Sequence, residues 1–396
     1  MFLALRDIRF ATGRFALMGA VVALITFLLI MLSGLTAGLA QQTTSAIEQL
    51  EADTVAFGAP AGEDEPSAEF TDSTVTSAQV DAWGSADGVE SASALGISQT
   101  RLDLSGDRQG STSVALFGAE SGATAAAGAG TELSSGEAVL SAGITEELDV
   151  GRGDTVVISG VELEVVDVVA EKSYSHLPVV WTTREDWQAA SHIDGTGGSE
   201  AEEIIGTVVI SSFTEDVTSE NPISSLTPGL WKAVTGAELS GGEIRDAVDE
   251  AAGTKAMSRG ESFHALPSYT SENGSLTMIQ GFLYGISALV ILAFLSVWTV
   301  QRTRDIAVLR ALGASSGYVL RDAVGQALIV LLLGAGLGGG LGAAGGLLAA
   351  DVAPFLTDLT TTLLPMTGVV VLGALGSVLA VRRVRTVDPM LALGGN

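Results

Sequence analysis

The sequence predicts a membrane protein with four transmembrane helices and a large α+β extracytoplasmic domain between helices 1 and 2. Two observations carry this prediction. Hydrophobic residues make up 47% of the 396 residues and charged residues only 16%, whereas soluble domains average about 25% charged residues. The formal net charge is nevertheless −27, so the charged residues must be concentrated in one part of the chain and leave long uncharged stretches elsewhere.

Four stretches contain no Asp, Glu, Lys, Arg or His, and they cover residues 16–40, 276–300, 323–350 and 359–381. Each is long enough for a hydrocarbon core, which needs about 20 apolar residues. We expect the first three as transmembrane helices with these bounds. We expect the fourth at 363–381, because Pro365 favours the first turn of a helix. The first stretch exceeds the roughly 7–15 apolar residues of a signal peptide, so we interpret it as an uncleaved helix.

Basic residues predict the orientation of these helices. Ten of the 19 Lys and Arg residues lie in the segments 1–15, 301–322 and 382–396, and none lies in the short loop 351–362. Lys and Arg accumulate on the cytoplasmic side of membrane proteins. We therefore expect a plasma (inner) membrane protein whose two termini and 301–322 loop are cytoplasmic.

Residues 41–275 form the exterior domain in this topology. They hold 9 basic and 40 acidic residues, which we interpret as a solvated acidic surface. A charge this negative argues against nucleic acid as a partner. Alternating β-branched and polar residues around Ser159-Gly160 predict a β-hairpin. Helical periodicity predicts helices over 77–83, 185–190 and 242–251. The domain is therefore expected to be α+β.

Two further patterns belong to the membrane region. Residues 1–15 place apolar side chains at helical spacing, with arginines elsewhere on the wheel, which predicts an amphipathic helix at the cytoplasmic interface. In the third span, glycine recurs at every fourth position, at Gly334, Gly338, Gly342 and Gly346. These glycines form one smooth helix stripe for close packing. We expect a helix–helix contact, either inside one protomer or between two copies.

Catalytic and metal-binding motifs are missing from the sequence. It has no cysteine, and His176, His192 and His264 do not have metal-binding spacing. It also has no Walker motif. No uncharged stretch offers an ionisable residue for a proton or ion relay. We therefore expect a non-catalytic transport subunit with no intrinsic cofactor and no metal site, whose energy comes from a partner.

The cytoplasmic loop 301–322 predicts where that partner binds. Its sequence from Arg302 to Gly313 is typical of a short helix with one apolar face. Such a helix can dock into a groove on another protein, although it can also pack on its own bundle. The residues that we expect to make the contact are Arg302, Arg304, Asp305, Ile306, Leu309, Arg310, Leu312 and Gly313.

This loop resembles the signature of the FtsX- and MacB-type ABC transporter permeases. The tail RVRTVDPMLAL at 383–393 resembles the closing motif of that family, and LDVGRGDTV at 148–156 resembles its outside domain. The resemblance implies a homodimer in the lipid bilayer, paired with two copies of a cytoplasmic ABC ATPase that binds the ATP. Closure of the ATPases would push on the loop and move the outside domains. Asp305 departs from the family's usual glutamate, which keeps the charge but shortens its reach.

Further segments resemble the DevC-like branch of the family that contains the haem-efflux permease HrtB. They are ADTVAF at 52–57, YSHLPVVW at 174–181 and PSYTSE at 267–272. The resemblance implies that Phe57, Tyr174 and Glu272 bind haem, which would be the transported substrate and no cofactor. Phenylalanine can stack on the ring, and tyrosinate is a known axial ligand of haem iron. His176 is a rival ligand.

Structural interpretations of these residues stay open. Phe57 can pack in the exterior domain, Tyr174 can be a buried tyrosine, and Glu272 can cap the start of the second span. The exterior domain is also longer and more acidic than in typical haem-efflux permeases. Another cargo, such as a peptide or an antibiotic, is therefore an alternative. A second alternative is an FtsX-like signal-coupling module that acts on a cell-wall hydrolase or lipoprotein.

Overall fold

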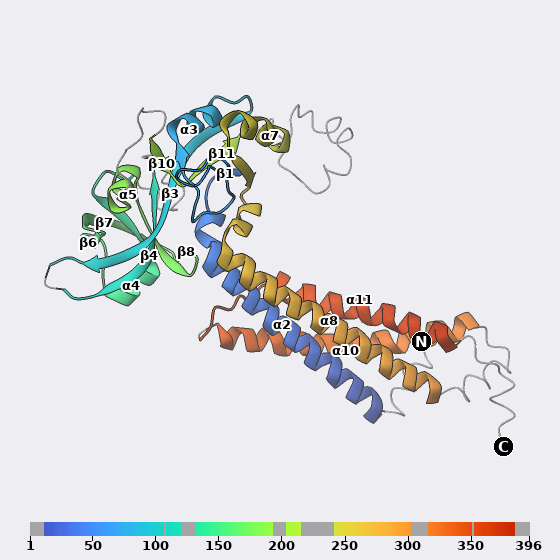
Figure 1. Cartoon of the computed structure of the whole chain (residues 1–396). Coiled ribbons are helices and arrows are strands. Elements are labelled where there is room, and N and C mark those ends of the chain that lie inside the picture. The colour runs from blue at the N-terminus through green and yellow to red at the C-terminus, as the bar shows by residue number, and fades with distance from the viewer. Residues whose placement is uncertain are drawn as a thin grey trace, which may run out of the picture. The chain divides into compact units, whose positions relative to one another are not determined.

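The computed structural model describes residues 12–106, 108–120, 132–192, 203–214, 241–301, 316–350 and 352–384. The chain divides into two compact units, a helical unit of Met1–Leu39 with Glu272–Asn396 and a domain of Ala40–Ser271. Figure 1 shows the long helices of the first unit and the sheet of the second. Both boundaries between the units fall inside long helices, so the chain enters and leaves the domain as helix.

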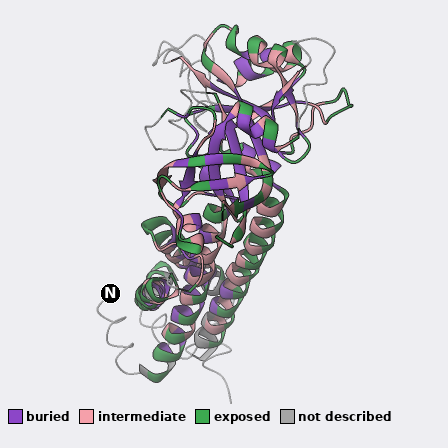
Figure 2. Ribbon diagram, turned by 90° about the vertical axis from the view of Figure 1, so that its left-hand side faces the viewer, coloured by how far each residue is buried: buried purple, intermediate pink, exposed green. Residues whose placement is uncertain are grey.

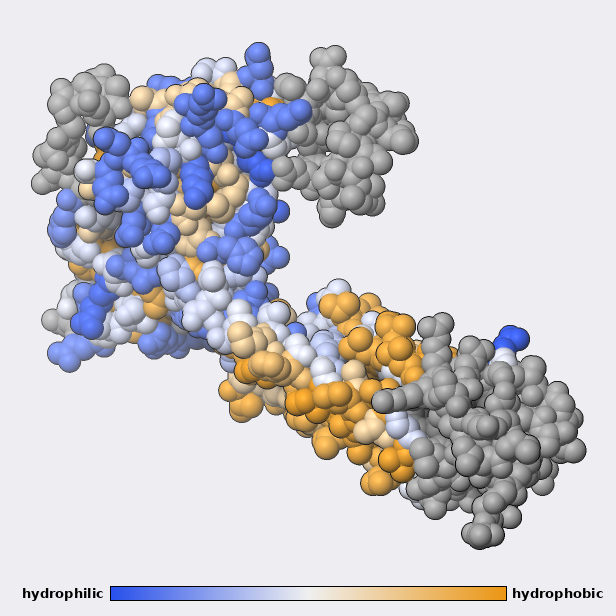
Figure 3. Space-filling view, turned by 45° about the vertical axis from the view of Figure 1, so that its right-hand side comes forward, coloured by the Kyte–Doolittle hydropathy of each residue, from blue (hydrophilic) through white to orange (hydrophobic). Residues whose placement is uncertain are grey.

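Four long helices form the described part of the helical unit: α2 (Thr12–Glu48), α8 (Pro267–Gln301), α10 (Ser316–Ala349) and α11 (Leu359–Val384). Each contains a stretch that is long and apolar enough to cross a membrane. Leucines such as Leu24, Leu333 and Leu364 are exposed on their outer faces. Figure 3 shows how apolar side chains gather on the visible face of these helices. Such a surface is stable in lipid and unfavourable in water.

Two of these helices extend beyond the uncharged stretches on the side of the domain. Helix α2 ends at Glu48 and α8 begins at Pro267, whereas the sequence predicts spans that end at 40 and begin at 276. The end of α2 is stabilised by the domain, because Ala46 and Ile47 are buried in a core of domain residues. Tertiary packing of this kind extends helices beyond their intrinsic preference.

Helix α11 begins earlier than the expected residue 363, at Leu359. Asp358 accepts hydrogen bonds from the Thr361 amide (2.6 Å) and the Thr360 hydroxyl (2.7 Å), while the Thr361 hydroxyl accepts one from the Asp358 amide (3.0 Å). This reciprocal arrangement is a capping box, which starts a helix at the residue that follows the cap. Pro365 therefore lies inside the helix, and the expectation that it occupies the first turn is wrong.

The domain is built on a ten-stranded sheet with the order β12-β1-β11-β3-β4-β9-β5-β7-β6, to which β8 adds by pairing with β9. An additional pairing of β6 with β3 closes β3, β4, β9, β5, β7 and β6 into a barrel. The strands are β1 (Thr54–Phe57), β3 (Val89–Leu104), β4 (Ser111–Ala119), β5 (Glu137–Ser141), β6 (Thr155–Ile158), β7 (Val161–Val169), β8 (Ser173–Tyr174), β9 (Leu177–Thr183), β11 (Val208–Phe213) and β12 (Lys255–Ser258). A separate two-stranded sheet pairs β2 (Val75–Thr76) with β10 (Ile204–Gly206).

The long strand β3 belongs to both parts of this sheet. Its first residues pair with β11, and its later residues pair with β4 and with β6. Strand pairs β4–β9 and β5–β7 are parallel, and the other pairs in the sheet are antiparallel. One continuous strand therefore ties the barrel to the four-stranded sheet β12-β1-β11-β3.

Three hydrophobic cores lie in the domain. One fills the barrel and includes Leu116, Leu140 and Val165. A second lies under helices α3 (Ser77–Gly84) and α7 (Gly241–Ala252) and includes Trp83 and Ile244. The third contains the end of α2 and most of the domain's buried aromatic rings. Figure 2 shows the buried residues concentrated along the strands.

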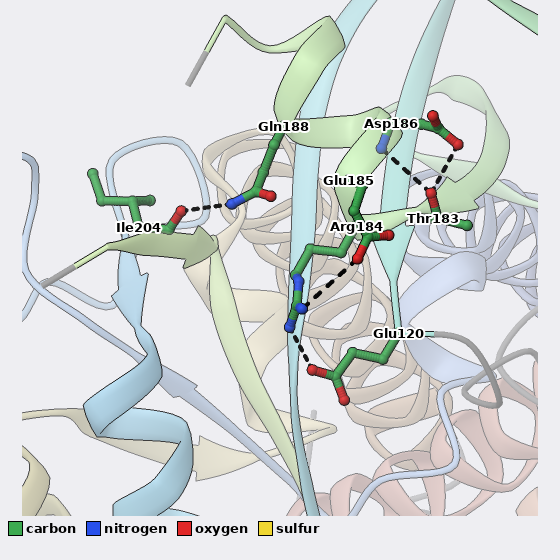
Figure 4. Close-up of polar contacts among 7 residues, drawn as sticks. All are labelled: Glu120, Thr183, Arg184, Glu185, Asp186, Gln188 and Ile204. Carbon is green, nitrogen blue, oxygen red and sulfur yellow. Dashed lines mark hydrogen bonds and ion pairs between the residues drawn. The ribbon is translucent and has the colours of Figure 1, made fainter. Parts of the chain in front are cut away.

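The barrel carries helix α5 (Arg184–Ala190) on a flat patch of two strands. Gly96 of β3 and Gly118 of β4 pair in register, and a Cβ atom at either position would meet Trp187. Figure 4 shows the polar contacts at this helix: the Asp186 amide donates to the Thr183 hydroxyl (3.3 Å), Arg184 pairs with Glu120, and the Gln188 amide donates to the Ile204 carbonyl (3.0 Å). The N-cap, the ion pair and the tryptophan fix α5 to the barrel.

The expected fold class is confirmed: four apolar helices accompany a large α+β domain inserted between the first and second of them. The hairpin around Ser159-Gly160 is also confirmed, as β6 and β7, and the three expected domain helices are α3, α5 and α7. Helix α4 (Ala142–Leu148) and the 3₁₀ helix η3 (Glu261–Ala265) were not expected from the sequence.

Candidate functional site

Phe57 and Tyr174 lie in the same hydrophobic cluster of the domain, and both side chains are buried. Phe70 lies between them, with ring centroids 4.9 Å from Phe57 and 5.9 Å from Tyr174. Phe117 stands 5.5 Å from Tyr174 and 6.4 Å from Trp181. All four pairs are edge-on, the geometry that aromatic rings prefer in a packed core. We call these five residues the aromatic cluster.

Tyr174 is a core residue in this conformation. Only 2% of its surface is exposed, and burial raises the pKa of its hydroxyl above the ordinary range. The phenol is therefore protonated at physiological pH, whereas an iron ligand would be the tyrosinate. Binding of haem iron by Tyr174 consequently requires a conformation in which this side chain leaves the cluster.

His176 lies beside the aromatic cluster, at the tip of the β8–β9 hairpin. Tyr174 pairs with Leu177, so Ser175 and His176 form a two-residue turn, with φ angles of 50° and 65°. The imidazole Nε2 lies 3.3 Å from the hydroxyl of Thr43, near the end of α2. The structure therefore places His176 in a contact with a helix that continues into the first membrane span.

Glu272 lies on α8, in the helical unit, and is half-buried. A carboxylate caps a helix from its first turn. Because α8 begins at Pro267, Glu272 lies beyond that turn. The alternative in which it caps the second span is therefore wrong. Phe57, Tyr174 and His176 belong to the domain, and the convergence of Glu272 with them stays a prediction.

The glycine stripe on α10 lies against α2 at three of its four positions. A Cβ atom at Gly334 would lie 2.9 Å from Val22, one at Gly338 would meet the Ala23 carbonyl, and one at Gly342 would lie 2.8 Å from Ile30. Gly346 instead lies against Phe355 and Thr357, which precede α11. These contacts are made inside one copy of the chain.

Several expected elements lie outside the described residues. The loop residues Arg302, Arg304, Asp305, Ile306, Leu309, Arg310, Leu312 and Gly313 are among them, as is most of the N-terminal segment 1–15. Most of the tail 382–396 is outside as well. The coupling helix and the amphipathic N-terminal helix therefore stay predictions.

Other residues of the site were not expected from the sequence. Phe70 lies in a turn and Phe117 lies on β4, and both are far from Tyr174 along the chain. Trp181 lies on β9, in the same hairpin as Tyr174. Ser45 on α2 and Ser268 on α8 bond to the segment around Tyr174.

No group of three or more His, Asp or Glu side chains within the described ranges could hold a metal ion. The aromatic cluster offers a phenol and apolar ring faces, and the adjacent turn offers an imidazole.

Two family profiles match the chain. The MacB-like periplasmic core domain matches residues 15–227, which is more than half of the chain, and the FtsX-like permease C-terminal domain matches residues 277–389. The chain belongs to the MacB/FtsX family of ABC transporter permeases. The two matches leave residues 228–276 between them, so together they cover most of the domain and most of each of the four long helices.

Individual relatives match shorter parts of this permease. A Mycobacterium tuberculosis protein named "Uncharacterized ABC transporter permease" is 33% identical over 128 residues, 31% of this chain and 34% of the relative. A Staphylococcus epidermidis protein named "Putative hemin transport system permease protein HrtB" is 26% identical over 130 residues, 33% of this chain and 37% of the relative. The matches thus span about a third of these curated relatives. The periplasmic region of MacB from Actinobacillus actinomycetemcomitans aligns over 56% of this chain and 94% of its own, with 12% identity and a TM-score of 0.34.

Proposed function

We propose that this permease is the membrane subunit of an ABC-type efflux system that works by mechanotransmission. Two copies would pair with two cytoplasmic ATPase subunits, which bind and hydrolyse the ATP. The observation that carries the proposal is the continuity of α2 and α8, which run without a break from their apolar stretches into the domain. A continuous helix transmits a displacement along its axis, whereas a flexible loop would absorb it.

The proposed cargo is haem, taken from the outer leaflet of the plasma membrane. The relative named as a hemin transport permease supports this cargo. The placement of Phe57 and Tyr174 in one aromatic cluster, with His176 in the adjacent turn, supports it as well. Haem is a flat apolar ring with two propionates, so aromatic faces would hold the ring and an oxygen or nitrogen donor would bind the iron.

A hemin titration tests the cargo. The purified full chain in detergent should shift the Soret band of hemin, and Tyr174→Phe or Glu272→Gln should weaken this binding by about tenfold or more, which corresponds to 1.4 kcal/mol. Tyr284→Phe and Glu250→Gln are matched controls that change the same chemical groups outside the candidate site, because Tyr284 packs against the core of the helical unit and Glu250 lies on α7. Both should bind hemin like the natural chain.

An unchanged hemin spectrum on addition of the natural chain would refute haem as the cargo. Under that result the cargo of the permease would be a peptide or an antibiotic. The alternative is an FtsX-like signal-coupling module whose domain binds a secreted cell-wall hydrolase or lipoprotein. Equal binding by the natural chain and the Tyr174 and Glu272 variants would keep haem as a ligand but remove it from this site.

A further inference from the structure

The segment Glu171–His176 connects three parts of the domain through consecutive residues, and we call it the strap. At its start, the Lys172 amide donates to the Ser141 hydroxyl (2.7 Å) and the Glu171 carboxylate accepts from the Gly143 amide (2.5 Å). Ser141 is the last residue of β5, and Gly143 is the second residue of α4. The first two residues of the strap are therefore attached to the barrel.

The remainder of the strap is attached to the end of α2. The Ser173 amide donates to the Ser45 hydroxyl (2.9 Å), and the Ser175 amide donates to the Thr43 carbonyl (2.9 Å). The His176 amide donates to the Gln42 carbonyl (3.1 Å). These three backbone donors follow the last turns of α2, so the strap must move if this end of the helix moves.

The strap also contacts the start of α8. The hydroxyls of Ser175 and Ser268 lie 3.1 Å apart, and Ser268 is the second residue of α8. Ser175 therefore contacts both helices that connect the domain to the membrane spans: α2 through its amide and α8 through its side chain.

The turn that makes these contacts is built from unfavourable residues. Ser175 and His176 both have positive φ angles, which two-residue hairpins usually assign to Asn and Gly, because a side chain there costs about 1–2 kcal/mol. Retained strain of this kind points to a function for the side chains. Here the side chains reach the two helices.

We infer that the strap links movement of α2 and α8 to the aromatic cluster, so that displacement of the helices moves Tyr174 out of the core. This inference rests on the proposed mechanotransmission function and extends it to the place where the domain receives the movement. Tyr174 has attachments to α2 on both sides, at Ser173 and at Ser175. Its ring cannot keep its contacts with Phe70 and Phe117 if the end of α2 shifts relative to the barrel.

Hydrogen exchange of the full chain in nanodiscs, purified with its ATPase, tests the strap. Strap amides should exchange about tenfold faster or more in one nucleotide state than in the other, because helix movement breaks their hydrogen bonds. The hydrogen bonds that the structure describes at the β6–β7 hairpin around Ser159 join it to β3 and not to α2 or α8. Its amides should exchange equally in both states.

Ser175→Gly and Ser159→Gly form a matched pair of variants. Both serines have a φ angle of 50°, and both begin a two-residue turn. Each hydroxyl lies within hydrogen-bond distance of another hydroxyl: that of Ser175 is 3.1 Å from Ser268, and that of Ser159 is 3.0 Å from Thr100. Both variants relieve the same strain, so neither should unfold the domain. Only Ser175→Gly should reduce the nucleotide-dependent difference at the strap, to below about twofold. Thr43→Val, which removes the hydroxyl facing His176, should reduce it as well.

Equal exchange of the strap in both nucleotide states, in a complex that hydrolyses ATP, would overturn the inference. So would an unchanged difference in both Ser175→Gly and Thr43→Val. Failure of the proposed function has a different signature, which is the absence of ATP-driven transport by the natural chain. ATP hydrolysis and transport are measured on the same sample, so the two failures are separated.

Discussion

Single glycines decide how closely the membrane helices approach one another. Gly338 and Gly340 lie two residues apart on α10, yet a Cβ atom at Gly338 would meet the Ala23 carbonyl of α2, and one at Gly340 would meet nothing within 4 Å. Backbone contacts of this kind are possible only where a side chain is missing. The difference between the two positions is therefore a test of the packing between α2 and α10.

Gly338→Ala should destabilise the helical unit, because the new methyl group forces α10 away from α2. The expected cost is that of overpacking, about 1–3 kcal/mol, which thermal unfolding in detergent would detect as a lower Tm. Gly340→Ala adds the same methyl group on the open face and should leave the Tm unchanged. Equal Tm values for the two variants would show that α10 does not pack against α2 through this stripe.

Glu261 predicts how the domain responds to acid. Hydrogen bonds from the hydroxyl and the amide of Ser258 lower the pKa of its carboxyl below the ordinary 4.5. The folded state thus binds this proton more weakly than the unfolded state, so the stabilisation is present above the unfolded pKa and is lost as the pH falls through the folded pKa. As the pH is lowered from 6, the free energy of unfolding of Glu261→Gln should therefore fall less than that of the natural chain. Urea unfolding at a series of pH values measures this difference.

At the scale of the element, the flat patch under α5 is set by two glycines in register. Gly96 and Gly118 pair across β3 and β4, and Trp187 lies on both of them. Any side chain there would displace the tryptophan from a position where it is almost fully buried. The docking of α5 therefore depends on residues of two strands and not on the helix alone.

Gly96→Ala should lower the free energy of unfolding of the domain by about 1–3 kcal/mol, since the methyl group and the Trp187 ring cannot occupy the same space. Chemical unfolding followed by tryptophan fluorescence would measure the change. Gly151→Ala is the control, because its Cβ atom would meet nothing within 4 Å. A Gly96→Ala domain as stable as this control would contradict the described position of α5.

Two hairpin turns show which elements the sequence could predict. Ser159-Gly160 has a glycine at a position with a positive φ angle, and it follows the turn chemistry of two-residue hairpins. Ser175-His176 has the same geometry with neither Asn nor Gly, because contacts with α2 and α8 override the local preference. The hairpin at Tyr174 could therefore not be predicted from turn residues.

The candidate site was predictable only in part for a similar reason. The uncharged stretches reveal the membrane helices by composition alone, and the resemblance selected Phe57 and Tyr174, which do share one cluster. Phe117 joins them through the pairing of β4 with β9, and Phe70 joins them from a turn that lies far from Tyr174 along the chain. Periodicity within one segment contains no information about such pairing.

At the scale of the whole molecule, the orientation in the membrane is a prediction from basic residues. The chain has no cysteine, so single cysteines can be introduced without background. Ser85→Cys, at an exposed position of the domain, should react with a membrane-impermeant maleimide in intact cells. Thr303→Cys, in the loop that we expect in the cytoplasm, should react only after the cells are permeabilised. The reverse pattern would place the domain in the cytoplasm.

The central claim is that this chain is moved by ATP hydrolysis in another protein. Proteoliposomes that contain the chain alone, or the chain together with its ATPase, test this claim with ATP supplied on the side of the 301–322 loop. We expect that the chain alone neither hydrolyses ATP nor moves hemin, and that both activities are present when the ATPase is added. ATP-driven hemin transport by the chain alone would show that no second protein is needed to move it.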